Sequence, residues 1–91
     1  MQNEKRVERH LVEQCKKRDF KCIKQAPTLT GLPDRLIITQ GTMFFIELKD
    51  PRGVLSEAQK IVHADFKKRG VDVYTCSSTE EIAKVLDLYD K

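Results

Sequence analysis

Apolar residues recur along the chain in two spacings, which predict three helices and four strands. Three segments carry an apolar residue at every third or fourth position, the period of a helix with one buried face. Shorter apolar runs bounded by turn residues are typical of strands. In chain order we expect a helix over 3–17, a strand over 20–24, two strands around 36–38 and 43–46, a helix from 56 that Gly70 ends, a strand over 71–76 and a helix over 79–89.

Each predicted helix has an apolar stripe that we expect to face the core. The stripes are Val7, Leu11, Val12 and Cys15 in the first helix, Ala58, Ile61, Val62 and Phe66 in the second, and Ile82, Val85, Leu86 and Tyr89 in the third. Asn3 is a candidate N-cap of the first helix. Ser56 with Gln59, and Ser78 with Glu81, have the spacing of a capping box at the other two helix starts.

Gln40-Gly41 joins the two central strands, and a polar residue beside glycine is typical of a tight hairpin turn. If Thr39 pairs with Thr42, counting outward sets Ile38 opposite Met43, Ile37 opposite Phe44, Leu36 opposite Phe45 and Arg35 opposite Ile46. The next pair is Asp34 and Glu47, whose Cβ atoms would lie about 4.5–5.5 Å apart. A shift of one residue would set Asp34 against Ile46 or Leu48 and separate the two carboxylates.

The predicted order αβββαβα defines an α/β fold with a mixed central sheet. The hairpin is antiparallel, whereas the strand–helix–strand unit from Met43 to Cys76 is expected to be a right-handed crossover between parallel strands. No repeat or linker divides the chain, and 91 residues are enough for one domain but not for two. We therefore expect residues 1–91 to form a single domain.

Charge and composition narrow the function classes only slightly. The net charge is +3, from 17 Lys and Arg against 14 Asp and Glu, which alone does not establish nucleic-acid binding. Basic residues cluster at 16–24 and 67–69, so one basic face is expected, although such runs are often only solvated. No apolar stretch is long enough to span a bilayer and no signal peptide is recognisable, so we expect no membrane association.

The three cysteines, Cys15, Cys22 and Cys76, are odd in number and lack a Cys-x-x-Cys spacing. Neither a disulfide framework nor a zinc site is therefore supported. Each stands in an apolar run and is expected to pack as a small, reduced apolar residue. An intracellular location in a host or bacterial cytoplasm fits this pattern.

The hairpin carries the candidate chemistry. Lys49 follows Glu47 by two residues and leaves the strand on the same face, about 7 Å further along. Two carboxylates and an ammonium on one surface suit a divalent cation, which generates a nucleophile from water, and an attacked phosphate, whose charge the ammonium stabilises. Taken singly, Asp34 is also a common turn residue, and Glu47 and Lys49 fit a solvated edge strand. Taken together they favour catalysis, because a charged face on middle strands is costly without a function.

Three motifs in this order resemble the VRR-NUC (virus-type replication-repair nuclease) family of the PD-(D/E)XK nuclease superfamily. They are Gly31-Leu32-Pro33-Asp34-Arg35, Phe45-Ile46-Glu47-Leu48-Lys49 and Leu55-Ser56-Glu57-Ala58-Gln59. Pro-Asp and Glu-x-Lys are weak signals in isolation, but on consecutive strands before a Leu-Ser-x-x-Gln helix start they become specific. The resemblance covers almost the whole chain and implies a restriction-endonuclease-like αβββαβ core in a minimal, stand-alone nuclease domain.

The resemblance implies a role for each matching hairpin residue. Asp34 and Glu47 would bind Mg²⁺ or Mn²⁺, with the Leu48 carbonyl as a further ligand. Lys49 would orient the attacking water or stabilise charge on the phosphate. Gln59 corresponds to a glutamine that supports the site, and a capping role alone is the alternative.

An acidic residue of the first helix also contributes to the site in this family. Glu8 is the best match, and Glu4 and Glu13 are the alternatives. A position on the flank of a helix is equally typical of a glutamate that is only solvated. The sequence therefore does not decide whether this acidic residue belongs to the site or is only exposed to solvent.

DNA is the expected partner. Arg35, Arg52 and Lys60 are candidate contacts to backbone phosphates, since all three lie near the predicted site. We expect a metal-dependent endonuclease that cuts branched DNA such as Holliday junctions as a homodimer, because two sites related by a twofold axis suit paired cuts. The alternatives are a nuclease for flap or linear ends, a non-catalytic DNA-binding or scaffold module, and a small α/β interaction protein.

Overall fold

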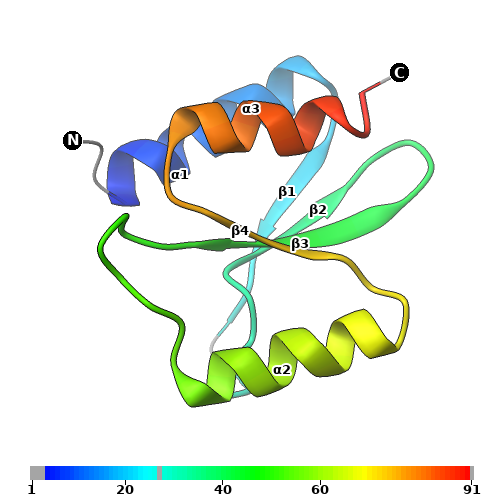
Figure 1. The fold of residues 1–91 in the computed structure, drawn as a ribbon. Helices are drawn as coiled ribbons and strands as arrows, with labels where there is room; N and C mark the ends of the chain where they lie inside the picture. The colour runs from blue at the N-terminus through cyan, green and yellow to red at the C-terminus, as the bar shows by residue number, and fades with distance from the viewer. Residues whose placement is uncertain (1–3, 27, 91) are drawn as a thin grey trace.

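The computed structural model describes residues 4–26 and 28–90, which form a four-stranded mixed sheet with helices on both faces (Figure 1). In chain order the elements are α1 (Glu4–Lys17), β1 (Lys21–Lys24), β2 (Arg35–Ile38), β3 (Met43–Leu48), α2 (Glu57–Lys68), β4 (Val73–Cys76) and α3 (Thr79–Asp87). This order confirms the expected α/β fold with a C-terminal helix. Asn3, the expected cap of the first helix, lies outside the described residues. None of the described helices is long and apolar enough to cross a membrane.

The sheet has the strand order β1-β2-β3-β4. The first two pairs are antiparallel, and β3 and β4 are parallel on either side of α2 in the chain. In the hairpin Arg35 pairs with Ile46, and the Thr39 N–H donates to the Thr42 carbonyl at 2.9 Å. The predicted register is therefore confirmed along the whole β2–β3 ladder.

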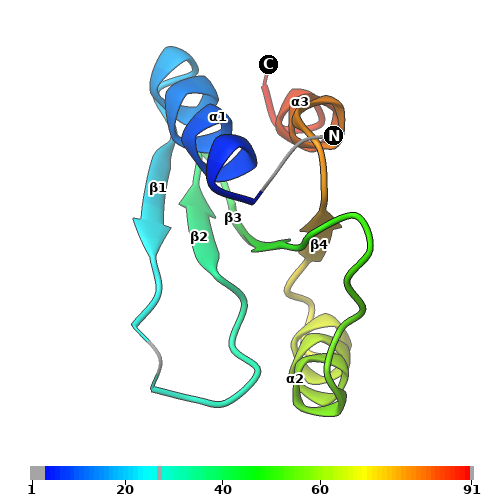
Figure 2. The same cartoon turned by 90° about the vertical axis from the view of Figure 1, so that its left-hand side faces the viewer.

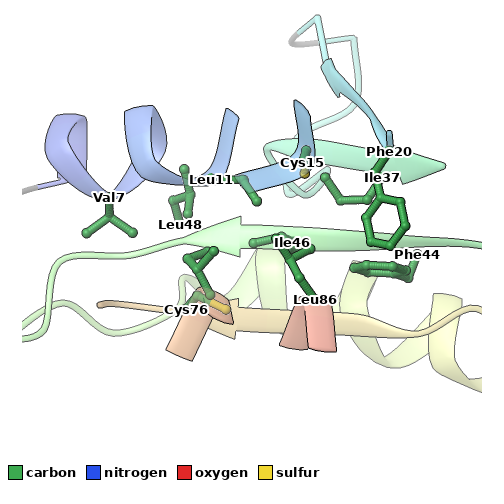
Figure 3. Packing of buried hydrophobic residues seen from close by; sticks show 11 residues of the cluster. Val7, Leu11, Cys15, Phe20, Ile37, Phe44, Ile46, Leu48, Cys76 and Leu86 are labelled. Carbon is green, nitrogen blue, oxygen red and sulfur yellow. The ribbon is translucent and has the colours of Figure 1, made fainter. Parts of the chain in front are cut away.

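α1 and α3 lie side by side over one face of the sheet (Figures 1 and 2). The core fills the space beneath them, as Figure 3 shows for the side chains that meet there. It includes Val7, Leu11 and Cys15 of α1, Ile37 of β2, Phe44, Ile46 and Leu48 of β3, Cys76 of β4, and Ile82 and Leu86 of α3. Most of the two predicted stripes is thus confirmed, although Val12 is not part of this core and Tyr89 packs against it from beyond the end of α3 at Asp87. Because side chains alternate along a strand, Glu47 leaves β3 on the opposite face, toward α2.

α2 covers that second face only in part. In Figure 2 the helix lies beneath β4, while no helix of the described residues lies beneath β1 and β2. The predicted inward stripe of α2 needs a correction, because Ile61 is 68% exposed. The sheet-facing side instead carries the polar residues Gln59 and His63 together with Phe66, whose ring centroid lies 5.1 Å from that of Phe45. The polar residues of this helix occupy positions where an apolar stripe was expected.

The ends of α2 and α3 agree only in part with the predicted caps and boundaries. The Ser56 and Gln59 capping box is formed. At α3 the Ser78 hydroxyl accepts from the Glu81 N–H, but the Glu81 carboxylate accepts from Ser77 instead of Ser78, so only half of the second box exists. β4 begins at Val73 instead of at position 71, because the N–H of residue 71 donates to a carbonyl of α2 behind Gly70.

The three cysteines are free thiols. Cys15 and Cys76 are buried in the core, and Cys22 is half-buried at its margin. Burial raises the pKa of the Cys76 thiol to about 12. Cys15 and Cys76 therefore pack as small apolar side chains, as the sequence predicts, whereas the Cys22 thiol has its pKa lowered to about 7 by the Cys15 hydrogen bond and the charge of Arg35.

Candidate active site

Asp34 and Glu47 meet at the open end of the β2–β3 hairpin. Asp34 directly precedes β2, and the next step of the ladder beyond Arg35 and Ile46 places it across from Glu47. The Asp34 Oδ2 accepts a hydrogen bond from the Leu48 N–H at 2.9 Å. This bond fixes the aspartate beside the main chain of β3, so the confirmed register brings the two predicted carboxylates together.

Glu47 is a buried carboxylate, with 2% of its surface exposed. Its Oε2 accepts from the Gln59 Nε2 at 3.2 Å, and its Oε1 lies 3.5 Å from the His63 Nε2. Burial, together with the hydrogen bond and the negative charge of Asp34, raises the pKa of Glu47 to about 8. Such a shift is typical of functional carboxylates that share one site.

Lys49 and Gln59 complete the polar cluster on this face. The Lys49 Nζ donates to the Gln59 Oε1 at 3.4 Å, and its positive charge partly offsets the raised pKa of Glu47. Gln59 serves two purposes, since its Oε1 also accepts from the Ser56 N–H at 2.8 Å within the capping box. The cap and the contact with Glu47 therefore occur together, and the helix start itself aims the amide at the carboxylate.

The first helix brings an acidic residue to the same region. Glu8 and Glu4 line a cavity of about 240 Å³ together with Asp34 and Leu48. Glu13 lines a separate cavity, with His10. The geometry therefore favours Glu8 or Glu4 over Glu13 as the acidic partner. Glu8 is held in place by an ion pair, with its Oε2 at 2.9 Å from the Nη2 of Arg35.

The three candidate phosphate contacts lie in different surroundings. Arg35 points to the α1 side of the sheet, where its guanidinium pairs with Glu8 and its Nη1 lies 3.9 Å from the Cys22 Sγ. Arg52 is exposed in the loop between β3 and α2, and Lys60 is exposed on the first turn of α2. The cluster on the α2 face thus has two exposed cations near it, and Arg35 lies behind it.

His63 is a member of the cluster that the sequence pattern did not single out. Its side chain is 12% exposed and lies beside the least exposed carboxylate of the site. Burial lowers the pKa of His63, and the negative charge of Asp34 opposes that shift. The available signal was its spacing, because a residue four positions after Gln59 lies on the same helix face.

The donor set fits a divalent cation that keeps part of its water. Among the described residues, no three His, Cys, Asp or Glu side chains converge closely enough to hold a metal ion as they stand. Mg²⁺ needs only one or two carboxylates and retains several waters. Asp34 and Glu47 supply those carboxylates, and the buried Glu47 Oε1 has no hydrogen-bond partner among the described residues. A cation would neutralise the negative charge that raises the pKa of Glu47.

Comparisons with known proteins bear on the family and the fold of this chain. The model of the VRR-NUC domain family matches residues 2–80. A solved structure described as a VRR_NUC domain superposes with a TM-score of 0.84 at 27% sequence identity, covering 94% of this chain and 96% of the other. No curated protein sequence matches the chain.

Proposed function

This chain belongs to the VRR-NUC family of nuclease domains, and from that premise we propose that it is a DNA endonuclease dependent on Mg²⁺ or Mn²⁺. The observation that carries the proposal is the state of Glu47. It is a buried carboxylate with a raised pKa, an oxygen without a partner among the described residues, and a second carboxylate beside it. Two adjacent carboxylates that resist ionising together are suited to a cation, which would stabilise both in the ionised form.

In the proposed mechanism Asp34 and Glu47 hold the ion, with the Leu48 carbonyl as a further ligand. The chemistry that such an ion would supply is a water of lowered pKa and a positive charge opposite that of the attacked phosphate. Lys49 places its ammonium over the non-bridging phosphate oxygens, where charge develops. Gln59 holds both Glu47 and Lys49 in register, since it hydrogen-bonds each of them.

We assign supporting roles to the remaining candidates. Glu8 would orient the attacking water from the α1 side of the cavity that it shares with Asp34. Arg35 acts chiefly by holding Glu8, because its guanidinium is already paired. Arg52 and Lys60, both exposed near the start of α2, contact the DNA backbone. A DNA substrate and three free thiols fit a reducing, intracellular compartment.

We further propose that the nuclease acts on branched DNA as a homodimer. The described chain measures 33 Å along its longest axes, which is about one turn of duplex DNA. A single copy therefore reaches little beyond one arm of a junction. The part of the sheet that α2 leaves uncovered carries the exposed residues Ile23 and Met43, which offer an apolar surface for a second copy.

A cleavage panel tests this proposal. Purified protein with Mg²⁺ or Mn²⁺ is incubated with four-way, flap and linear DNA, beside the variants Glu47→Ala and Lys49→Ala. We expect nicking of the four-way junction with little cleavage of linear duplex, and a loss of at least about 100-fold in each variant. Lys84→Ala, on an exposed position of α3, is the matched control and is expected to cut like the parent.

The outcomes separate the alternatives. If both site variants cut as fast as the parent, the assigned site is wrong. Equal cleavage of all three substrates would remove the preference for junctions and leave a nuclease. DNA binding that weakens steeply with salt, with no metal-dependent cleavage by the parent, would indicate the non-catalytic binding module instead.

A further inference from the structure

α2 approaches Glu47 with two side chains instead of one. Gln59 and His63 are four residues apart and therefore share a face of the helix. The Gln59 Nε2 donates to Oε2 of Glu47 at 3.2 Å, whereas the His63 Nε2 stands 3.5 Å from Oε1. Each carboxylate oxygen thus faces one side chain of the same helix, and the pair brackets the carboxylate.

Glu47 and His63 face each other without forming a hydrogen bond. The Glu47 Oε1 and the His63 Nε2 are both buried, and neither has a hydrogen-bond partner among the described residues. N–H···O bonds in proteins span about 2.7–3.2 Å, so an approach of about 0.6 Å would join these two atoms. Buried polar atoms are nearly always hydrogen-bonded, and a facing pair of unpartnered atoms therefore points to a state in which they meet.

We propose that His63 is a positioning residue for the metal-binding carboxylate, donating its Nε2–H to the Oε1 of Glu47 when that carboxylate is ionised. This inference rests on the proposed metal-dependent function. An ionised carboxylate has about four acceptor positions, so the two donors from α2 leave lone pairs on the Asp34 side for a cation. Held at both oxygens, Glu47 presents those lone pairs in one orientation. Outer partners of this kind commonly change metal affinity by about 10–100-fold when they are removed.

Direct ligation of the ion by His63 is the competing interpretation. Mg²⁺ is a hard cation that prefers oxygen donors, whereas imidazole suits softer transition metals. The described side chains also do not converge into a three-ligand His and carboxylate site. Positioning through Glu47 therefore agrees better with the donor set than a metal–nitrogen bond does.

The test compares two substitutions of His63 in the full chain. His63→Gln keeps an N–H donor at similar reach, whereas His63→Leu removes the donor and keeps the bulk. Binding is measured with Mn²⁺ alone, as the ion concentration that gives a half-maximal rise in melting temperature and as the loss of the free-ion resonance. We expect the leucine variant to need at least about tenfold more Mn²⁺ and the glutamine variant to stay within about threefold of the parent.

His10→Leu, on the only other histidine of the sequence, is the matched control and should bind like the parent. Electron spin echo spectroscopy of the Mn²⁺-loaded parent should show no coupling to imidazole nitrogen. Nitrogen coupling, or a glutamine variant as impaired as the leucine variant, would show that imidazole itself ligates the ion and overturn the proposal. The proposal would also be overturned if the His63→Leu variant bound Mn²⁺ as tightly as the parent does.

Two further outcomes keep the conclusions separate. If the parent itself binds no Mn²⁺, the proposed function fails together with this inference. If the parent binds and the leucine variant binds equally, only the role of His63 fails. Should His63→Leu not fold, the glutamine variant and the spectrum of the parent decide by the same criteria.

Discussion

Glu47 is the residue whose protonation we expect to couple the stability of the protein to the proposed metal binding. Its pKa is raised from 4.5 to about 8 by burial and by Asp34. Between these pH values the folded chain keeps a proton that the unfolded chain has released. The native state then binds more protons, and so the free energy of unfolding falls as pH rises. The stabilisation due to the Glu47 proton is fully present below the pKa of Glu47 in the unfolded chain. It is lost as the pH rises through the pKa of Glu47 in the folded chain.

We predict this slope in EDTA between pH 6.5 and 8, above the ordinary pKa of His63. The free energy of unfolding from urea titrations should fall by up to about 1.4 kcal/mol per pH unit because of this group. Glu47→Gln should flatten the dependence, and saturating Mg²⁺ should do the same in the parent, because the cation replaces the proton. Glu57→Gln, a surface control, should keep the parental slope. Parallel slopes in the parent and Glu47→Gln would contradict the assignment.

Several individual residues were predictable because their spacing has a geometric meaning. Glu47 and Lys49 share a strand face, and Asp34 follows from the hairpin register, which the structure confirms. His63 was harder to predict, since its spacing of four residues from Gln59 gains a meaning only once the buried carboxylate opposite the helix is known. The choice of Glu8 or Glu4 over Glu13 likewise needed the position of α1 over the sheet.

Among the elements, the loop that leads into β2 is tied to the start of α2 through Gly31. This glycine has φ +92°, a conformation that L side chains rarely adopt. A Cβ at this position would lie 2.5 Å from the Ala58 carbonyl oxygen and 3.0 Å from the Gln59 N. The first turn of α2, which aims Gln59 at Glu47, therefore depends on the absence of a side chain in the loop.

We predict that Gly31→Ala destabilises the fold by roughly 1–3 kcal/mol and lowers cleavage, because it combines backbone strain with a clash at the helix that holds the site. Gly70→Ala separates the two causes, since Gly70 has φ +85° but open space within the described structure. It should cost about 1 kcal/mol and leave cleavage intact. Gly41→Ala should change stability by less than about 0.5 kcal/mol. Urea unfolding and junction cleavage are measured for all three, and equal effects at positions 31 and 70 would count against the clash.

The elements themselves were largely predictable, and the orientation of α2 was the exception. α1 and α3 bury regular apolar stripes, so their periodicity identifies the inward face. α2 places Gln59 and His63 toward the sheet and leaves Ile61 exposed, so its apolar residues no longer mark one face. When a helix turns polar site residues toward the sheet, its apolar residues no longer form the stripe that identifies the buried face.

At the scale of the whole molecule, the uneven cover of the sheet bears on assembly. α1 and α3 cover one face, whereas α2 lies beneath β4 and leaves the β1–β2 part of the other face open in the described structure (Figure 2). Ile23 and Met43 leave the sheet on that open side and are 43% and 55% exposed. A second copy placed on this side would bury both apolar side chains, and Glu47 leaves β3 toward the same side.

We predict that the double variant Ile23→Glu/Met43→Glu is monomeric, because charges on this face would have to be buried in a pair of chains. Sedimentation should give the mass of two 10.5 kDa chains for the parent and of one for the variant. Leu88→Glu, at an exposed apolar position after α3, is the control and should stay dimeric. Since Glu47 and Lys49 are untouched, the monomer should still nick flap DNA while paired cuts at a four-way junction are lost. A parent that sediments as one chain, or a dimeric double variant, would refute this interface without affecting the nuclease assignment.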